Sequence, residues 1–212
     1  MILDMHVHST IGEGGYARPS EYAKRVNYLR ENGYDIDGFV LTEHNKFGKN
    51  GFHEEFKSKY DVTVFSGVEV TTNLGHILVF GVKDNSFRRS HYLDSQKLID
   101  WANNHNCVAV PAHPFSINTR SKWSTELAKI RGVYVIEGLN GALSIEENKN
   151  ALDYAKENKL KTTGGSDAHR LRQFGRCLTN FNVEIATIDD LLDALAHAKY
   201  EPIRLEDARK KD

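Results

Sequence analysis

Short apolar segments alternate with amphipathic segments along most of the chain, and this alternation limits its possible folds. The apolar segments are rich in Val, Ile, Leu and Phe, as strands buried on both faces are. Helical patterns separate most of them, so an α/β fold with a largely parallel sheet is expected, open or closed into a barrel. The expected strands are 2–7, 36–42, 62–70, 76–82, 107–112, 133–137 and 161–165, and the expected helices are 19–31, 54–60, 92–105, 124–130, 144–158 and 188–198.

Length and charge narrow the class of protein. A chain of 212 residues fits one domain over 1–212, with a charged tail at 204–212 that is expected to fray. A formal net charge of -1 predicts no strong nucleic-acid-binding surface. Two cysteines, no apolar run near ~18 residues and an acidic start unlike a signal peptide favour a cytoplasmic protein without a membrane partner.

Potential metal ligands lie at the carboxyl ends of five expected strands. In α/β sheets and barrels these ends converge on one face, where sites are built. Imidazole and carboxylate are the ligands that zinc, iron and manganese accept, and without cations such a cluster would be costly in desolvation and repulsion. A site with more than one metal is therefore expected, against the alternative of ordinary polar side chains at a solvated rim. The residues are His6, His8, His44, Glu69, His113, Asp167 and His169.

The remaining histidines are interpreted differently. Four of them lie on or beside helical segments and are expected at the surface or in packing: His53, His91, His105 and His197. His76 opens its expected strand instead of closing it, so strand position alone leaves its role open.

Six motifs follow one another along the chain: His6-x-His8, Thr42-Glu43-His44, Gly67-Val68-Glu69, His76-Ile77-Leu78, Ala112-His113-Pro114 and Ser166-Asp167-Ala168-His169. Together they resemble the PHP family, named for polymerase and histidinol phosphatase, from Met1 to about Asn182. The resemblance implies a distorted seven-stranded (β/α)7 barrel with two or three divalent ions (Zn, Mn or Fe) in its mouth. It also implies that His76 serves the metal site and that Glu13, in a Gly-bearing loop, supplies a further ligand. Glu43 stands where the family more often has Asp.

The expected chemistry is hydrolysis of a phosphate ester by a metal-bridging hydroxide. Two ions about 3.5–4 Å apart can bridge a water and lower its pKa from 15.7 towards roughly 7. Glu69 is expected to bridge two ions, and Asp167 and His169 are the other expected catalytic residues. The expected ligand groups are His6, His8 and Asp167 around one ion, Glu13, His44 and His169 around another, and His76 and His113 at a further one.

The substrate is expected to be small and phosphorylated, either a phosphomonoester or a short nucleotide or oligonucleotide. Guanidinium groups and amides suit phosphate oxygens, and the expected contacts are Arg120, Arg170, Arg172, Arg176 and Asn140. Glu137, like Asn140, ends an expected strand and has three open roles: orienting substrate, supporting the ligands or capping a helix. The oligomeric state stays open.

Two other functions are considered. A metal-dependent amidohydrolase would cleave C–N bonds on a similar barrel, but that class often uses a modified lysine as a bridge. No Lys lies between His76 and Gly81. The third possibility is a PHP-like module that has no catalytic activity. The complete set of potential ligands argues against it.

Overall fold

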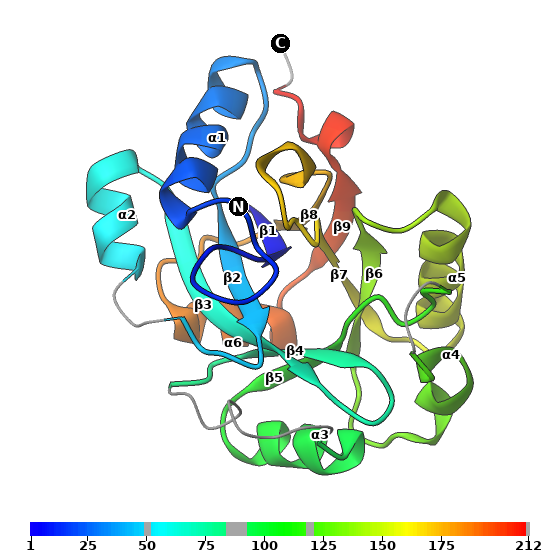
Figure 1. Ribbon diagram of the computed structural model, residues 1–212. Helices are drawn as coiled ribbons and strands as arrows, with labels where there is room; N and C mark the ends of the chain where they lie inside the picture. Colours follow the sequence, from blue (N-terminus) through cyan, green and yellow to red (C-terminus); the bar gives the residue numbers. More distant parts are fainter. Residues whose placement is uncertain (49–51, 84–92, 118–120, 211–212) are drawn as a thin grey trace.

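The computed structural model describes residues 1–48, 52–83, 93–117 and 121–210. Its strands are β1 Ile2–Val7, β2 Gly38–His44, β3 Thr63–Thr71, β4 His76–Phe80, β5 Val108–Pro111, β6 Val135–Asn140, β7 Lys161–Gly165, β8 Cys177–Phe181 and β9 Tyr200–Arg204. Its helices are α1 Pro19–Glu31, α2 Phe52–Tyr60, α3 Ser95–Asn104, α4 Trp123–Glu126, α5 Ile145–Glu157 and α6 Ile188–His197. The strands curl around one interior with helices outside them (Figure 1). The predicted α/β class is confirmed.

The sheet is a curled half-barrel. Seven strands pair in the order β5-β4-β3-β2-β1-β8-β9, and β6 and β7 form a separate parallel pair. The β6–β7 pair packs between the two edges of the large sheet, because β6 contacts the edge strand β5 and β7 contacts the edge strand β9 as well as β1 and β8. Within the large sheet only the pairs β1–β2 and β2–β3 are parallel, and the pairs β3–β4, β4–β5, β1–β8 and β8–β9 are antiparallel. The distorted (β/α)7 barrel that the family resemblance implied is therefore not confirmed in detail, because the large sheet is mixed and β6 and β7 pair separately.

The connection between β3 and β4 explains part of this difference. A parallel crossover needs about a dozen residues or more, whereas residues 72–75 alone join these two strands. The turn closes when the Thr72 N–H donates to the Gly75 carbonyl at 2.9 Å, with Gly75 at a φ of 142° that favours glycine. Because β4 is reversed, its first residue lies at the same edge as the last residue of β3.

Two strands and an ordered tail were not predicted. The strands β8 and β9 extend the sheet beyond β1, where β8 pairs with Ile2 and Leu3. The tail was expected to fray, but a single 3-10 turn over Leu205–Ala208 follows β9. Ala208 is buried and its carbonyl accepts from the Asp35 N–H at 2.6 Å. The turn is held because the apolar residues Leu205 and Ala208, placed among the charges, pack on the core.

The interior of the half-barrel is apolar at the end opposite the carboxyl end of β1. Buried side chains from seven strands of both sheets meet residues of α6 there, including Leu3, Val40, Phe65, Leu78, Val110, Val135, Phe181, Leu191 and Leu195. This packing closes one end of the interior, so polar side chains gather at the other end. In the described part of the chain, no helix combines the length and apolarity needed to cross a membrane. Both cysteines are buried and unpaired, as expected.

Candidate metal centre

Period-two alternation along β2 and β3 aims two ligands at the interior. Val40 and Phe65 point into the apolar core, and His44 and Glu69 follow each of them by four residues on the same face. The two strands pair in register with His44 opposite Glu69. The sequence therefore changes from apolar to ligand along one face of each strand.

Bulges in β1 and β6 lie next to His6 and Glu137 and affect where these two side chains point. Compared with its neighbour, β1 has one extra residue between Asp4 and Val7, and β6 has one between Glu137 and Leu139. Such bulges bend a strand and re-aim its side chains, often beside functional sites. In this protein they accompany a contact of 2.9 Å between His6 Nδ1 and Glu137 Oε1.

The reversed direction of β4 resolves the role of His76. Its backbone pairs with Thr71 at the end of β3, so the start of β4 lies at the same edge as Glu69. The strand β5 is antiparallel to β4, and its end brings His113 to that edge as well. This geometry brings His76 beside Glu69, and the role in the metal site that the family resemblance implied for it stays a prediction.

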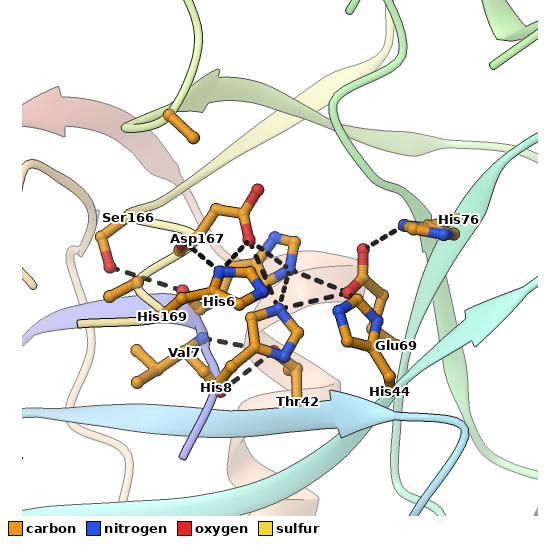
Figure 2. Close-up of polar contacts among 12 residues, drawn as sticks. His6, Val7, His8, Thr42, His44, Glu69, His76, Ser166, Asp167 and His169 are labelled. Atoms are coloured by element: carbon orange, nitrogen blue, oxygen red, sulfur yellow. Dashed lines mark hydrogen bonds and ion pairs between the residues drawn. The ribbon is translucent and has the colours of Figure 1, made fainter. Parts of the chain in front are cut away.

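Glu69 stands at the centre of the cluster. Its side chain is 1% exposed, so both oxygens are inside the protein. Oε2 lies within 3.5 Å of ring nitrogens of His6, His8 and His44, and Oε1 lies within 3.1 Å of ring nitrogens of His76 and His113. Figure 2 shows Glu69 between His76 on one side and His6 and His8 on the other. One carboxylate thus joins two groups of imidazoles.

Asp167 forms the opposite wall. Its Oδ1 lies 3.3 Å from His8 Nε2, 3.5 Å from His6 Nε2 and 3.6 Å from His169 Nδ1. Asp167 and His113 have positive φ angles of 52° and 33°, which residues other than Gly rarely adopt. Strained backbone at two candidate ligands is typical of a functional site.

The donor atoms fit bound cations. His6 Nε2 and His8 Nε2 face each other at 3.1 Å, and ligands about 2.0–2.1 Å from one ion lie roughly 2.9–3.4 Å apart. Glu69 Oε2 is buried beside three imidazoles and has no hydrogen bond of good geometry. Buried polar atoms are ordinarily hydrogen-bonded, and a cation would satisfy this oxygen.

Three groups of donor atoms lie close enough to hold an ion, each within 4.8 Å. They are His6, His8 and Asp167; His8, His44 and His169; and His44, Glu69 and His76. The first group matches the expected one. In the second group, His8 stands where Glu13 was expected. In the third, His44 stands where His113 was expected, although His113 Nε2 lies 3.1 Å from Glu69 Oε1.

Glu13 is not brought into the cluster. Its side chain is exposed and belongs to none of the three donor groups. The loop approaches the centre through its glycines: Gly14 lies against the His169 ring and Gly12 against Glu43. Glu43 is buried and accepts a hydrogen bond from the Ser9 N–H at 3.0 Å, so it holds the loop and leaves Glu13 facing solvent.

Without a cation, protonated imidazoles balance the negative charge of the buried carboxylates. Burial lowers the pKa of His8, but hydrogen bonds to Asp167 and Glu69 outweigh it and raise that pKa to about 9. Burial also lowers the pKa of His6, but nearby carboxylates, with Asp167 contributing most, raise it well above the ordinary value. Burial would raise the pKa of Glu69, yet the imidazoles led by His76 hold it well below the ordinary value. These protons are what a bound cation would displace.

Buried polar residues behind the ligands hold them in place. Glu137 contacts His6 through one oxygen and accepts from the His113 N–H at 2.7 Å through the other. The Asn140 amide donates to Glu137 at 3.0 Å and to Asp167 at 3.3 Å. Asn140 is 1% exposed, so its expected contact with phosphate is replaced by a positioning role.

Asp4 is a supporting residue that the sequence analysis missed. It accepts from the Ser166 N–H at 2.8 Å and the Gly175 N–H at 3.0 Å, which fixes the segment that carries Asp167. Burial raises the pKa of Asp4 to about 6. The available signal was a lone acidic residue between apolar residues, two positions before His6.

Three of the expected phosphate-binding arginines are described by the structure and lie on exposed surface. Arg170 and Arg172 are exposed just after His169, and Arg176 donates to the Gly141 carbonyl at 3.4 Å. Arg120 lies outside the described residues, as does His91. The other histidines make packing or surface contacts: His53 stacks on Phe65, His105 stacks on Trp101, and His197 Nδ1 lies 2.9 Å from an Asp193 oxygen.

Comparisons with known proteins agree with this fold. Residues 146–200, from α5 to the start of β9, match the family described as PHP-associated. The uncharacterized protein MJ0417 of Methanocaldococcus jannaschii is 26% identical over 198 residues, which cover 90% of this chain and 75% of the relative.

Two solved structures are similar along nearly the whole chain. One is a two-domain protein from Bacteroides vulgatus containing a predicted PHP-like metal-dependent phosphoesterase, with a TM-score of 0.71, 21% identity and coverage of 97% of this chain and 65% of that one. The other is endonuclease Q in complex with a 27-mer duplex with an abasic lesion, with a TM-score of 0.62, 16% identity and coverage of 95% and 58%. This chain thus spans less than two thirds of either protein. The predicted resemblance is confirmed: the chain has the fold of PHP-like proteins and matches the PHP-associated family over residues 146–200.

Proposed function

We propose that this protein hydrolyses phosphate esters at the cluster around Glu69 with two or three divalent ions, which we take to be zinc, manganese or iron. The observation that carries the proposal is the position of Glu69, whose two oxygens contact separate groups of imidazoles. Nitrogen and carboxylate donors in such a set suit these metals. When bound, the ions would supply Lewis-acid activation of water and neutralise phosphate charge.

The exposure of the ligands divides their roles. His6 and His8 are fully buried and Glu69 is nearly so, and together they form the floor that holds cations. Asp167 is 15% and His169 is 32% exposed, so these two side chains reach the open side where a substrate enters. We assign Asp167 and His169 to contact the attacking water and the ester, and Asn140 to fix the orientation of Asp167.

Hydrolysis of C–N bonds is the second candidate. Its characteristic bridge is a modified lysine, and no Lys lies in the segment from His76 to Gly81, where that bridge would be expected. Glu69 occupies the bridging place instead, which favours phosphate esters. A module without catalysis is disfavoured by the open side of the centre, where Asp167, His169, His44 and His76 are all partly exposed.

The substrate that we propose is a small phosphate ester. The net charge of -1 supplies no general attraction for a nucleic-acid backbone. Endonuclease Q is nevertheless recorded with duplex DNA, so an oligonucleotide belongs in any substrate screen.

The test combines metal analysis with a substrate panel. Purified protein is analysed for bound metal and assayed with Mn or Zn on phosphomonoesters, phosphodiesters, a short oligonucleotide and an amide panel. We expect phosphate-ester hydrolysis that falls about 100-fold or more in Glu69→Gln and Asp167→Asn. Asp193→Asn, an exposed Asp beside His197, is the matched control and should keep full activity. Occupied metal with no phosphate-ester hydrolysis, or hydrolysis of amides only, would overturn the proposal.

A further inference from the structure

Several exposed apolar side chains lie in segments that follow the strand ends of the candidate metal centre. Six large hydrophobic side chains are exposed among the residues that the structure describes: Tyr16, Tyr28, Ile117, Ile145, Leu171 and Val183. Four of these follow the ends of β1, β5, β6 and β7, the strand ends that carry the cluster or its supporting residues. Apolar groups concentrated at the mouth of a polar site suit a ligand with an apolar or planar part.

Tyr16 is the most directly placed of these four. Its N–H donates to the His169 carbonyl at 2.8 Å, so its backbone is fixed to a candidate ligand. Its side chain is 71% exposed, and the Arg170 guanidinium lies 5.0 Å from the centre of its ring. Gly14 has a φ of 89° beside the His169 ring, which lets the loop pass close to the centre.

We propose that Tyr16 and Arg170 form a platform on which the base of a nucleoside phosphate ester stacks while its phosphate reaches the metal centre. This inference rests on the proposed function and names its substrate class. An exposed aromatic ring stacks with any base, since every base has a π-face. A guanidinium stacked on an aromatic ring keeps its edge free for phosphate oxygens, so Arg170 can contact a sugar phosphate that has no base. The Tyr16 ring, in contrast, contributes only when a base is present.

The chain offers a matched control for the aromatic ring. Tyr28 is exposed on α1, and the Arg25 guanidinium lies 4.8 Å from its ring. This pair has the same chemistry as Tyr16 and Arg170 but lies on an outer helix. Tyr28→Ala therefore reproduces the loss of an exposed tyrosine next to an arginine without changing the mouth of the site.

The experiment compares adenosine 5′-monophosphate with ribose 5-phosphate, which has the same phosphate and sugar but no base. Equilibrium binding and KM are measured on the metal-loaded full chain. In Tyr16→Ala we expect Kd and KM for the nucleotide to rise about ten-fold, with values for ribose 5-phosphate unchanged. Tyr16→Phe keeps the ring and should behave like the unmodified protein, as should Tyr28→Ala.

The outcomes separate this inference from the proposed function. Binding of the nucleotide that depends on Tyr16, with no hydrolysis of any ester, would support the platform and overturn the function. Hydrolysis with equal effects of Tyr16→Ala on both compounds, or no effect on either, would overturn the platform and leave the function standing. A short oligonucleotide measured in parallel identifies the source of the base: a larger Tyr16 effect on the oligonucleotide indicates a nucleic-acid end, and a larger effect on the mononucleotide indicates a free nucleotide.

Discussion

At the scale of single residues, Glu137 shows how the ligands depend on the polar atoms behind them. It is 1% exposed and holds both the His6 ring and the His113 backbone. Loss of such a partner typically costs 10–100-fold in metal affinity. Glu137→Gln should therefore weaken metal binding by about 10-fold or more while the fold is kept. Competition with a chelating dye measures this, and the exposed Glu157→Gln is the control. Equal affinities in both variants would contradict the positioning role.

The protonation of His8 predicts opposite effects of pH on metal binding and on stability. With its pKa raised to about 9 from an ordinary 6.5, His8 carries a proton in the metal-free protein at neutral pH. Metal must displace this proton, so apparent affinity should rise with pH up to about 9 and then level off.

The stability of the metal-free protein should change in the other direction. A raised pKa in the folded state stabilises fully below the unfolded value of 6.5, and that stabilisation is lost as pH rises through about 9. Melting temperatures in a chelator and metal titrations, both at pH 6 to 10, check the two slopes. A metal affinity that is flat over this range would show that no protonated imidazole is displaced.

At the scale of strands, residue types revealed the ligands, and strand direction had to come from the structure. Val40 to His44 and Phe65 to Glu69 could be predicted because apolar runs end in ligands. His76 could not be assigned by position, because a prediction of parallel strands places the start of β4 at the wrong edge. The bulges leave no mark in the hydrophobic pattern, and β8 and β9 are short strands with polar residues. Glu13 was implied by the family resemblance, which indicates a loop but not which of its side chains faces inwards, and the structure leaves Glu13 exposed.

The close approach of β7 to β1 gives a prediction at this scale. A Cβ added at Gly165 would collide with the Cβ of His6, which must then shift. Gly165→Ala should therefore lower metal affinity. Gly33→Ala is the control, because its φ of 83° makes the substitution strained although nothing lies within 4 Å of the added Cβ. We expect Gly33→Ala to lower the melting temperature and leave metal binding unchanged; a similar loss of metal affinity in both variants would show that the Gly165 effect is only general destabilisation.

At the scale of the whole molecule, the two ends of the half-barrel have separate tasks. The carboxyl end of β1 carries the ionisable cluster, whereas the opposite end is closed by apolar residues of α6. The added strands β8 and β9 cover the open edge of β1, which protects it from pairing with another chain. We therefore expect that changes far from the cluster lower stability without altering the candidate metal centre.

The tail tests this division. Its 3-10 turn packs Leu205 and Ala208 on the core, and the Lys210 N–H donates to the Gly33 carbonyl at 2.9 Å. Deleting residues 205–212 removes this packing and leaves the Asp35 N–H without the Ala208 carbonyl. We expect a loss of about 2 kcal/mol or more, which is roughly 4–8 °C in melting temperature for a chain of this size. Metal stoichiometry should be unchanged, because no residue of the donor groups lies in the tail. Calorimetry with and without metal measures both, and an unchanged melting temperature would show that the tail is dispensable, as its charge alone suggests.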